Sequence, residues 1–169
     1  MIRDVPDFPE PGVMFKDISV LLADHGAFSR TVDALAAPVR AADASSTVDK
    51  VIGIEARGFI LGAPVALALG AGFVPVRKVG KLPGATHAAS YALEYGEATL
   101  EMHCDALDPG ERVLLVDDVL ATGGTVRAAA ELVRRAGAEA TAVSVLLELL
   151  ALGGRGRLSD LAVHTVLTA

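Results

Sequence analysis

The residues with the clearest chemical potential are two adjacent carboxylates, Asp117 and Asp118, which directly follow the apolar run 113–116. After them comes a glycine-bearing turn, made of Ala121, Thr122, Gly123, Gly124 and Thr125. If a parallel strand ends here and a helix begins, unpaired N–H groups and the positive end of the helix dipole favour an anion. The two glycines let the backbone approach that anion, and the two threonines add hydroxyl donors. We therefore expect a phosphate group at this turn.

The carboxylate pair suits a different part of the same ligand. Carboxylate oxygens can accept hydrogen bonds from the hydroxyls of a ribose or from the waters of a Mg²⁺ ion. They are less suited to contact the phosphate itself, which is also an anion. The alternative is that Asp117 and Asp118 only cap a helix or shape a turn. Capping needs one such residue, not two ahead of a Thr-Gly-Gly-Thr turn, so a ligand is favoured.

Two more segments carry charge close to apolar runs. Arg57 and Gly58 follow the run 51–54, and a guanidinium beside backbone N–H groups can bind a diphosphate. The alternative is a solvated Arg57 that pairs with Glu55. Further along, the stretch 78–89 has little apolar content and reads as a long loop, bordered by a basic cluster of Arg77, Lys78 and Lys81. It is either a solvated loop or a lid that closes over an anionic substrate.

The elements that would position these residues follow an alternating pattern. Apolar residues at 28, 32, 35 and 39 predict a helix with Asp24 as its N-cap. Beyond a connector at 43–49, the pattern predicts strands at 51–54, 73–76, 113–116 and 142–147, and helices at 59–69 and 125–136. The segment 93–104 alternates and predicts a two-stranded antiparallel excursion that turns at Gly96. Strand, helix, strand at these intervals implies an α/β fold with a central, mainly parallel sheet flanked by helices.

The chain's 169 residues predict one domain over 1–169. We expect an N-terminal arm or hood at 1–22, whose prolines give an extended surface segment, and a flexible lid loop with the excursion at about 78–104. Hydrophobic residues make up 52% and aromatic residues only 4%, so the core must be aliphatic. The uncharged stretch 58–76 is long enough for a membrane span, but its glycines and prolines divide it into a helix and a strand.

The turn and the two carboxylates together look like the phosphoribosyl pyrophosphate (PRPP) signature of the type I phosphoribosyltransferases. Four further segments resemble the adenine phosphoribosyltransferases: 11–19 (Pro-Gly-Val-Met-Phe-Lys-Asp-Ile-Ser), 55–59, 77–84 and 90–96. The resemblance covers nearly the whole chain. It departs in two places, since the chain starts almost at Arg3 without a short leading helix, and Lys16 stands where arginine is common.

The resemblance implies a set of roles. Asp117 and Asp118 face the ribose hydroxyls of PRPP, and the turn from Ala121 to Thr125 holds its 5′-phosphate. Pyrophosphate falls to Arg57, Gly58, Arg77, Lys78 and Lys81, and adenine to Met14, Phe15, Lys16 and Val119. Glu94 and Tyr95 are the catalytic residues, with the Glu94 carboxylate placed to take the proton that the purine loses when N9 attacks. Read from the residues alone, two alternatives stay open, in which Phe15 is core packing and Glu94 is an outward polar position on a strand.

The resemblance therefore implies transfer of the 5-phosphoribosyl group of PRPP to adenine, which yields AMP and pyrophosphate, with Mg²⁺ held mainly by PRPP and water. No residue is expected to ligate the metal directly. It also implies a homodimer in which Arg77 reaches the partner's site. Two alternatives stay open: a non-catalytic PRPP-sensing regulatory module, and a transferase for another base such as a 6-oxopurine.

Composition narrows the partners. The net charge of −6 argues against a chain that grips a nucleic-acid backbone. The single cysteine, Cys104, cannot form an internal disulfide, and no leader pattern precedes the first elements, so we expect a cytoplasmic protein with no membrane partner. The four histidines are scattered, which predicts no transition-metal site.

Overall fold

The computed structural model describes residues 1–41, 47–92 and 96–169. Its elements, in chain order, are β1 (Arg3–Pro6), β2 (Met14–Asp17), α1 (Ser19–Ala23), α2 (His25–Ala41), β3 (Lys50–Ile54), α3 (Arg57–Leu69), β4 (Gly72–Lys78), β5 (Thr86–Ala92), β6 (Glu97–His103), β7 (Arg112–Leu120), α4 (Gly124–Arg135), β8 (Glu139–Glu148), the 3₁₀ helices η2 (Leu150–Leu152) and η3 (Gly154–Leu158), and β9 (Ala162–Thr168).

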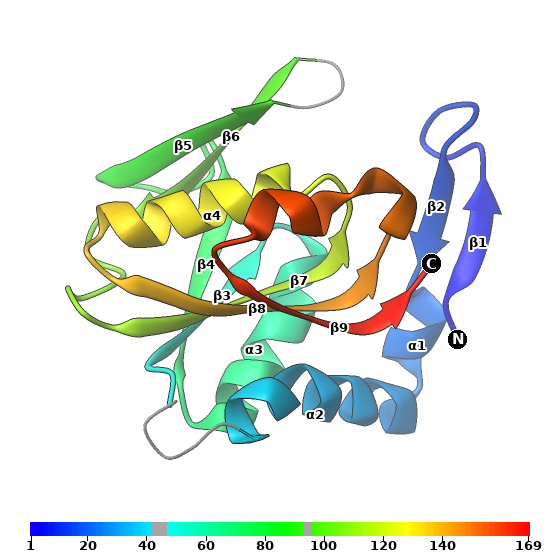
Figure 1. The fold of residues 1–169 in the computed structure, drawn as a ribbon, viewed down its shortest axis with the longest axis horizontal. Helices are drawn as coiled ribbons and strands as arrows, with labels where there is room; N and C mark the ends of the chain where they lie inside the picture. The colour runs from blue at the N-terminus through cyan, green and yellow to red at the C-terminus, as the bar shows by residue number, and fades with distance from the viewer. Residues whose placement is uncertain (42–46, 93–95) are drawn as a thin grey trace.

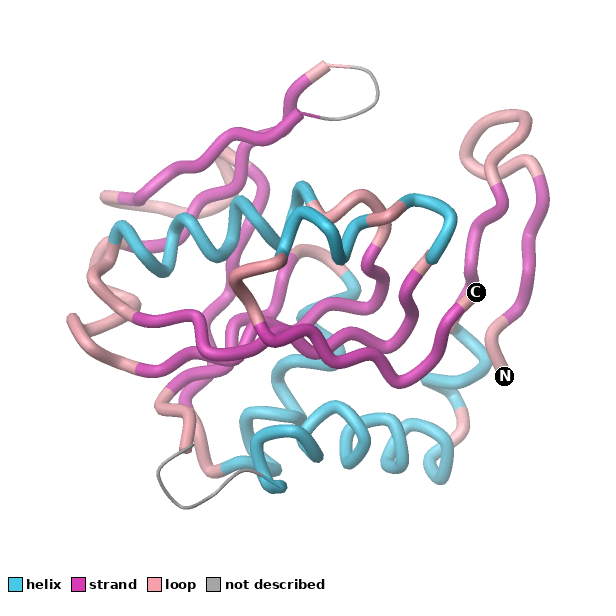
Figure 2. The backbone as a smooth tube through the Cα atoms, viewed as in Figure 1, coloured by secondary structure: helices cyan, strands magenta, loops and turns pink. Residues whose placement is uncertain are grey.

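Seven strands form one sheet in the order β5-β6-β4-β3-β7-β8-β9. The five strands from β4 to β9 are parallel, and β5 and β6 extend the sheet as an antiparallel pair. Helix α4 covers one face, while α1, α2 and α3 cover the other (Figure 1). The tube in Figure 2 shows the same three layers, with both termini on the side of the β1–β2 ribbon. The predicted α/β class with a mainly parallel sheet is confirmed.

Strand β7 shows why the sheet is buried on both faces. Leu114 and Val116 pack with α2 and α3, whereas Val113 and Leu115 pack with α4, because successive side chains of a strand point to opposite faces. A strand covered on both sides reads as a continuous apolar run rather than an alternation. That run is what made β7 recognisable in the sequence.

The helix predicted from residues 28 to 39 is α2. The Asp24 side chain accepts a hydrogen bond from the Ala27 backbone N–H at 2.7 Å, which confirms Asp24 as the N-cap. The uncharged stretch 58–76 divides into α3 and β4, as its glycines and prolines indicated. In the described part of the chain, no helix combines the length and apolar character that a membrane crossing requires.

Three predictions about local structure were incomplete or wrong. The N-terminal arm is extended and mostly exposed, but β1 pairs with β2 in an antiparallel ribbon in which Val5 lies opposite Phe15. The predicted loop 78–89 ends early, because β5 begins at Thr86, and the antiparallel excursion therefore starts there rather than at 93. Strand β5 is rich in alanine and lies at the sheet edge, so it carries no clear apolar alternation. Strand β9 was not predicted at all.

Candidate active site

The site forms where two neighbouring parallel strands end. In β3 and β7, Gly53 lies opposite Val116, so their carboxyl ends reach the same edge of the sheet. Helix α3 begins at Arg57, just beyond β3, and α4 begins at Gly124, just beyond β7. Ligands of open α/β sheets bind at this edge, where the helix N-termini offer unpaired N–H groups.

The turn between β7 and α4 has the conformation that its glycines allow. Gly123, the N-cap of α4, has φ of 82°, a left-handed value that residues with a Cβ rarely adopt. Among the described residues, no side chain caps this helix. A hollow of about 50 Å³ opens in the turn, lined by Val119, Leu120, Ala121, Thr122, Gly123, Thr125 and Val126. The free N–H groups of the helix start therefore border a small open space.

The two carboxylates sit immediately before this turn and are both buried, with exposed fractions of 8% for Asp117 and 6% for Asp118. Burial, reinforced by the charge of Asp118, raises the pKa of Asp117 well above its ordinary value. The Oδ2 atom of Asp118 is buried and has no hydrogen-bond partner among the described residues. It lies 2.7 Å from Nη2 of Arg57, an ion-pair contact whose angle does not make a hydrogen bond. A buried acceptor of this kind calls for a donor, which a ribose hydroxyl or a metal-bound water can supply.

Arg57 connects the carboxylates to the N-terminal ribbon. Besides Asp118, its guanidinium donates a hydrogen bond to the Lys16 carbonyl oxygen at 3.1 Å. It also lies over the Phe15 ring, 4.7 Å from the centroid. The alternative in which Arg57 is solvated and pairs with Glu55 is wrong. The Arg57 side chain therefore contacts both a predicted PRPP residue, Asp118, and two predicted adenine residues, Phe15 and Lys16.

Glu55 instead organises the start of the basic loop. Its Oε2 accepts the Lys78 backbone N–H at 2.7 Å, and its Oε1 lies 3.4 Å from Nη2 of Arg77. Burial acts to raise the pKa of Glu55, but these donors outweigh it and hold the pKa below its usual value. Arg77 also donates to the carbonyl of Lys81 at 3.1 Å. Arg77 and Lys78 are the last residues of β4 and Lys81 lies in the loop beyond them, so the contacts of Glu55 and Arg77 fix the start of that loop.

A second carboxylate, which the sequence did not single out, holds the same loop from the other side. Glu101 is buried and accepts the backbone N–H groups of Lys81 at 2.9 Å and Leu82 at 2.8 Å. These N–H donors, Leu82 foremost, lower the pKa of Glu101. The alternation in 99–103 put Glu101 among outward polar residues. The loop folds back over that face of β6 and buries it.

The remaining predicted residues fall as follows. Gly58 is buried so close to the end of β7 that a Cβ on it would lie 2.9 Å from both the Asp117 carboxylate and the Val116 carbonyl oxygen. Met14 is exposed, and Val119 is half-buried at the edge of the turn. Glu94 and Tyr95 lie outside the described residues.

This chain resembles known phosphoribosyltransferases in both sequence and fold. The phosphoribosyl transferase domain model matches residues 21–165. This chain belongs to the phosphoribosyl transferase domain family. An adenine phosphoribosyltransferase from Nocardioides sp. is 65% identical over 99% of this chain and 91% of its own length. The crystal structure of adenine phosphoribosyltransferase from Rhodothermus marinus is 53% identical, covering 99% of this chain and 94% of that one, with a TM-score of 0.93.

A third member of the phosphoribosyltransferase family adds a liganded view. The Saccharomyces cerevisiae adenine phosphoribosyltransferase was crystallised with adenine and an imino-altritol bisphosphate. It is 39% identical to this chain, covering 98% of it and 93% of the yeast chain, and superposes with a TM-score of 0.93. The fold described above is thus that of phosphoribosyltransferases.

Proposed function

We propose that this chain transfers the 5-phosphoribosyl group of PRPP to adenine and releases AMP and pyrophosphate. The observation that carries the proposal is the position of Arg57, which links Asp118 of the PRPP signature to Phe15 and Lys16 of the N-terminal ribbon. A sugar on the carboxylates and a base on the ribbon would lie on either side of one guanidinium. The names of relatives that are 58% to 65% identical over nearly the whole chain point to the same activity.

PRPP binds along the end of β7 in this proposal. The N–H groups from Ala121 to Thr125 hold the 5′-phosphate, and the Thr122 and Thr125 hydroxyls donate to it. Asp117 and Asp118 accept hydrogen bonds from the ribose hydroxyls. The Oδ2 of Asp118 has an ion-pair contact with Arg57 but no hydrogen bond among the described residues, which supports this role, because charge-assisted hydrogen bonds to a buried carboxylate contribute about 1.5 to 3 kcal/mol each.

The diphosphate lies toward the basic loop. Arg57 and the backbone of Gly58 bind it at the start of α3, Arg77 and Lys78 approach from the end of β4, and Lys81 approaches from the loop that follows. When Arg57 binds the diphosphate, its contact with Asp118 weakens, and Asp118 accepts hydrogen bonds from the ribose hydroxyls instead. Lys78 and Lys81 are exposed, so they can reach the leaving group without breaking buried contacts.

Adenine is bound by the ribbon. The β2 backbone at Met14 and Lys16 offers donors and acceptors to the base edge, the Phe15 ring stacks on the base, and Val119 closes the far side. Phe15 is held in place by an edge-to-face contact with Phe8, with ring centroids 5.0 Å apart and an interplanar angle of 74°. Phe15 is only half-buried, so its ring is not simply part of the core.

At the reaction centre, Glu94 accepts the proton that adenine loses as N9 attacks C1 of the ribose, and the C1–diphosphate bond breaks. Tyr95 arrives with it on the closing lid, 78–104. The transition state has oxocarbenium character, so closure excludes the water that would otherwise capture C1.

Mg²⁺ accompanies PRPP and neutralises charge on its diphosphate. The donor set fits this role, since Asp118 offers a buried oxygen suited to a metal-bound water. Among residues 1–41, 47–92 and 96–169, no cluster of three or more His, Cys, Asp or Glu side chains could hold an ion by itself. In this proposal PRPP and water supply most of the ligands.

The active unit is a homodimer. Leu67 is 84% exposed on α3, and Ile60, seven residues earlier on the same face of the helix, is also exposed, which gives an apolar surface that a second copy would cover. Within one chain Arg77 contacts Glu55 and Lys81; in the dimer it would reach the partner's diphosphate. Mixing Arg77→Ala subunits with Glu94→Gln subunits tests this, because a heterodimer has one site with both residues intact only if Arg77 acts across the interface. No recovery after confirmed subunit exchange would contradict the cross-subunit role.

Cys104 is an exposed free thiol, which suits a reducing, cytoplasmic setting. The decisive assay incubates the protein with PRPP and Mg²⁺ and, in parallel, adenine, hypoxanthine, guanine, xanthine or orotate. AMP and pyrophosphate formed only with adenine support the proposal. Product with a 6-oxopurine instead would favour another base, and PRPP binding without product would favour the sensing module.

A further inference from the structure

The turn 121–125, called the phosphate turn below, packs against residues 150–158, a segment for which the sequence suggested no role. After β8 the chain passes through η2 and η3, and Gly154 at the start of η3 is buried against the turn. A Cβ on Gly154 would overlap the Ala121 carbonyl oxygen and lie 2.9 Å from the Gly123 nitrogen. A Cβ on Gly123 would in turn lie 2.6 Å from the Gly154 carbonyl oxygen. The two backbones therefore pack against each other with no side chain between them.

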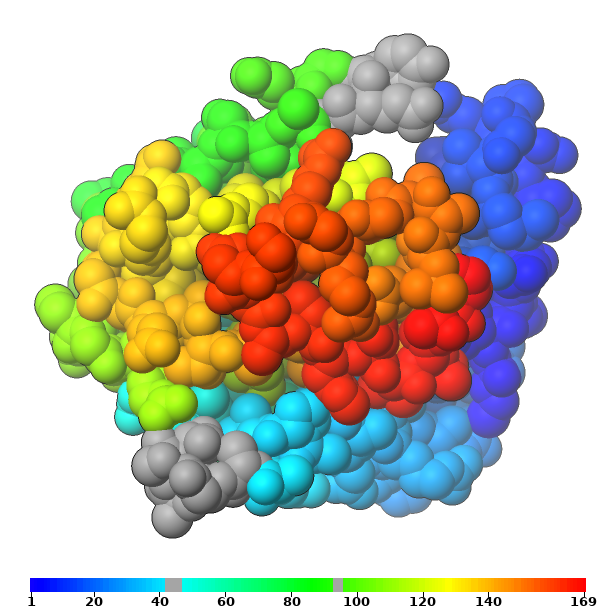
Figure 3. Space-filling view, viewed as in Figure 1, coloured from blue at the N-terminus to red at the C-terminus, as the bar shows by residue number. Residues whose placement is uncertain are grey.

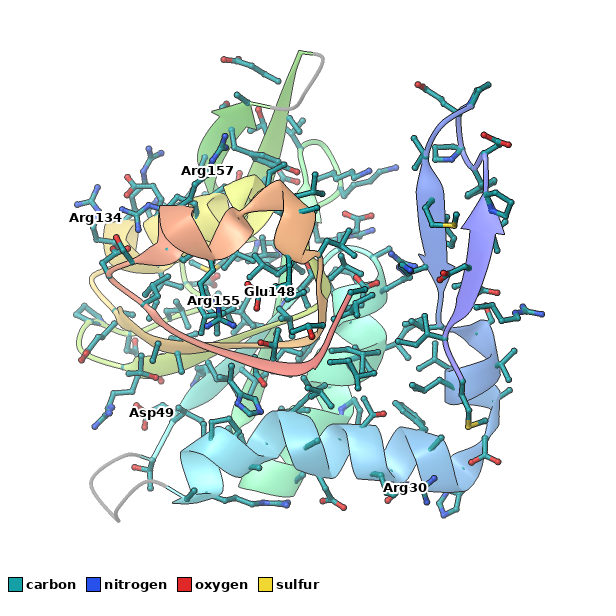
Figure 4. The ribbon with its side chains drawn as sticks, turned by 45° about the vertical axis from the view of Figure 1, so that its right-hand side comes forward. Arg30, Asp49, Arg134, Glu148, Arg155 and Arg157 are labelled. Atoms are coloured by element: carbon teal, nitrogen blue, oxygen red, sulfur yellow. The ribbon has the colours of Figure 1, made fainter. Side chains whose placement is uncertain are left out.

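Arg155 fixes the next position of this segment. Its guanidinium forms two parallel contacts with the Glu148 carboxylate, Nε to Oε1 at 3.0 Å and Nη2 to Oε2 at 2.5 Å. It also donates to the Val163 carbonyl oxygen at 2.7 Å and to the Thr165 hydroxyl at 2.8 Å. Thr165 completes the network by donating to Glu148 at 3.1 Å. In Figure 4, Arg155 and Glu148 lie beside each other beneath the 3₁₀ segment.

The ion pair of this network is buried on one side only, since the Arg155 side chain is 47% exposed. The Glu148 side chain is 5% exposed, so breaking the pair would leave a buried carboxylate with fewer donors, which is costly. A two-pronged guanidinium contact also fixes orientation as well as distance. Since Glu148 ends β8 and Thr165 lies in β9, the network ties Gly154 to the rigid sheet.

Other contacts hold the same segment. Leu158, at the end of η3, is buried in the core cluster that includes Leu132 of α4. The Leu149 backbone N–H donates to the Leu120 carbonyl oxygen at 2.9 Å, which joins the end of β8 to the last residue before the turn. In the space-filling view, the orange segment after β8 lies directly against the yellow α4 (Figure 3).

We propose that Gly154, held by the Arg155–Glu148 pair, is a positioning element that sets the backbone of the phosphate turn for the 5′-phosphate of the substrate. The inference rests on the proposed role of that turn. N–H donors bind an anion well only if they are already aimed at it, because otherwise the ligand must order them. No side chain of the described residues caps α4, so the Gly154 backbone packed against the turn supplies that order.

The test compares two glycines of one short helix. Gly154→Ala pushes on the turn, whereas Gly156→Ala is the matched control, since its Cβ would meet no atom within 4 Å and its φ is not left-handed. We expect Gly154→Ala to raise the KM for PRPP and the Kd for ribose 5-phosphate by at least about tenfold. The KM for adenine should change less than threefold, and Gly156→Ala should match the wild type.

A second pair of variants guards against misfolding of Gly154→Ala. Glu148→Gln keeps the size of the side chain but weakens the Arg155 contact, and it should raise the PRPP KM in the same direction. Asp160→Asn is its control, because it removes an exposed ion pair with Arg127 next to the same segment. Melting curves identify any variant that does not fold. A defect in packing alone would lower kcat through lost active protein and leave the KM for PRPP unchanged, which would overturn the inference.

Thr125→Ala, in the turn itself, tests the phosphate site separately from the positioning role of Gly154. If Thr125→Ala weakens ribose 5-phosphate binding and folded Gly154→Ala and Glu148→Gln do not, the inference is overturned and the phosphate site stands. If Thr125→Ala has no effect, the phosphate site is wrong and the inference fails with it. Equal rises in the KM values for PRPP and adenine in Gly154→Ala would also overturn it.

Discussion

Arg57→Lys tests whether the geometry of one guanidinium, rather than its charge, joins the two halves of the site. Lysine keeps the positive charge, but a single ammonium cannot contact Asp118, donate to the Lys16 carbonyl and cover the Phe15 ring at once. We expect the KM values for both PRPP and adenine to rise, because the substitution loosens both sides.

The magnitude follows from the contacts that are lost. A hydrogen bond from a charged donor contributes about 1.5 to 3 kcal/mol, and a cation–π contact about 0.5 to 1 kcal/mol at a partly exposed site. The Arg57 side chain is 33% exposed, so solvent screening reduces this sum. A net loss of about 2 kcal/mol remains, which corresponds to a fall of about 30-fold in kcat/KM.

Initial-rate kinetics with each substrate varied in turn provide the measurement. Arg127→Lys is the control, since Arg127 forms an exposed ion pair with Asp160, and its kcat/KM should stay within about twofold of wild type. A double-mutant cycle of Arg57→Lys with Phe15→Leu should show a coupling of about 0.5 to 1 kcal/mol. A kcat/KM for Arg57→Lys within threefold of wild type, or no coupling to Phe15, would refute the reasoning.

Three further substitutions probe the surroundings. Burial raises the pKa of Asp117, so the free energy of unfolding is greatest where this carboxyl is protonated and falls as pH rises through the raised pKa. Asp117→Asn should therefore be more stable than wild type at neutral pH, and the difference should vanish in acid. Urea unfolding at several pH values measures this, and a difference that stayed constant with pH would contradict it. Glu101→Gln weakens two hydrogen bonds at the base of the basic loop, so hydrogen exchange should quicken at the two amides that donate to it, and unchanged protection would count against a holding role. Gly58→Ala places a Cβ against backbone and carboxylate and should lose about 1 to 3 kcal/mol of stability together with PRPP affinity. In Gly72→Ala the close contact of the new Cβ is with the movable Lys50 side chain, and the Asp49 carbonyl oxygen lies at an ordinary 3.7 Å. Equal melting temperatures for the two variants would contradict the steric argument.

The sequence by itself determined the local parts of this protein. The run 113–116, two carboxylates and a Thr-Gly-Gly-Thr turn specify a buried strand that leads into a helix N-terminus, because periodicity and glycine conformation act over a few residues. The same holds for the Asp24 cap, which needs only residues three positions apart. These features predicted the turn between β7 and α4 and the α/β class correctly.

Only the tertiary structure decided which distant residues meet. Arg57 contacts Lys16, 41 residues earlier, and Asp118, 61 residues later, and nothing in the local pattern of any of them chooses that partner over Glu55. The sequence pattern predicts an outward polar position for Glu101, but in the structure the loop after β4 covers Glu101 and donates hydrogen bonds to it.

Gly154 gave no local signal either, because its role depends on the backbone of Gly123 and Ala121, which lie 31 and 33 residues earlier in the sequence. The physical reason is common to all three residues. Propensity and periodicity fix the direction of a side chain within its own element, but packing of the elements decides what that direction faces.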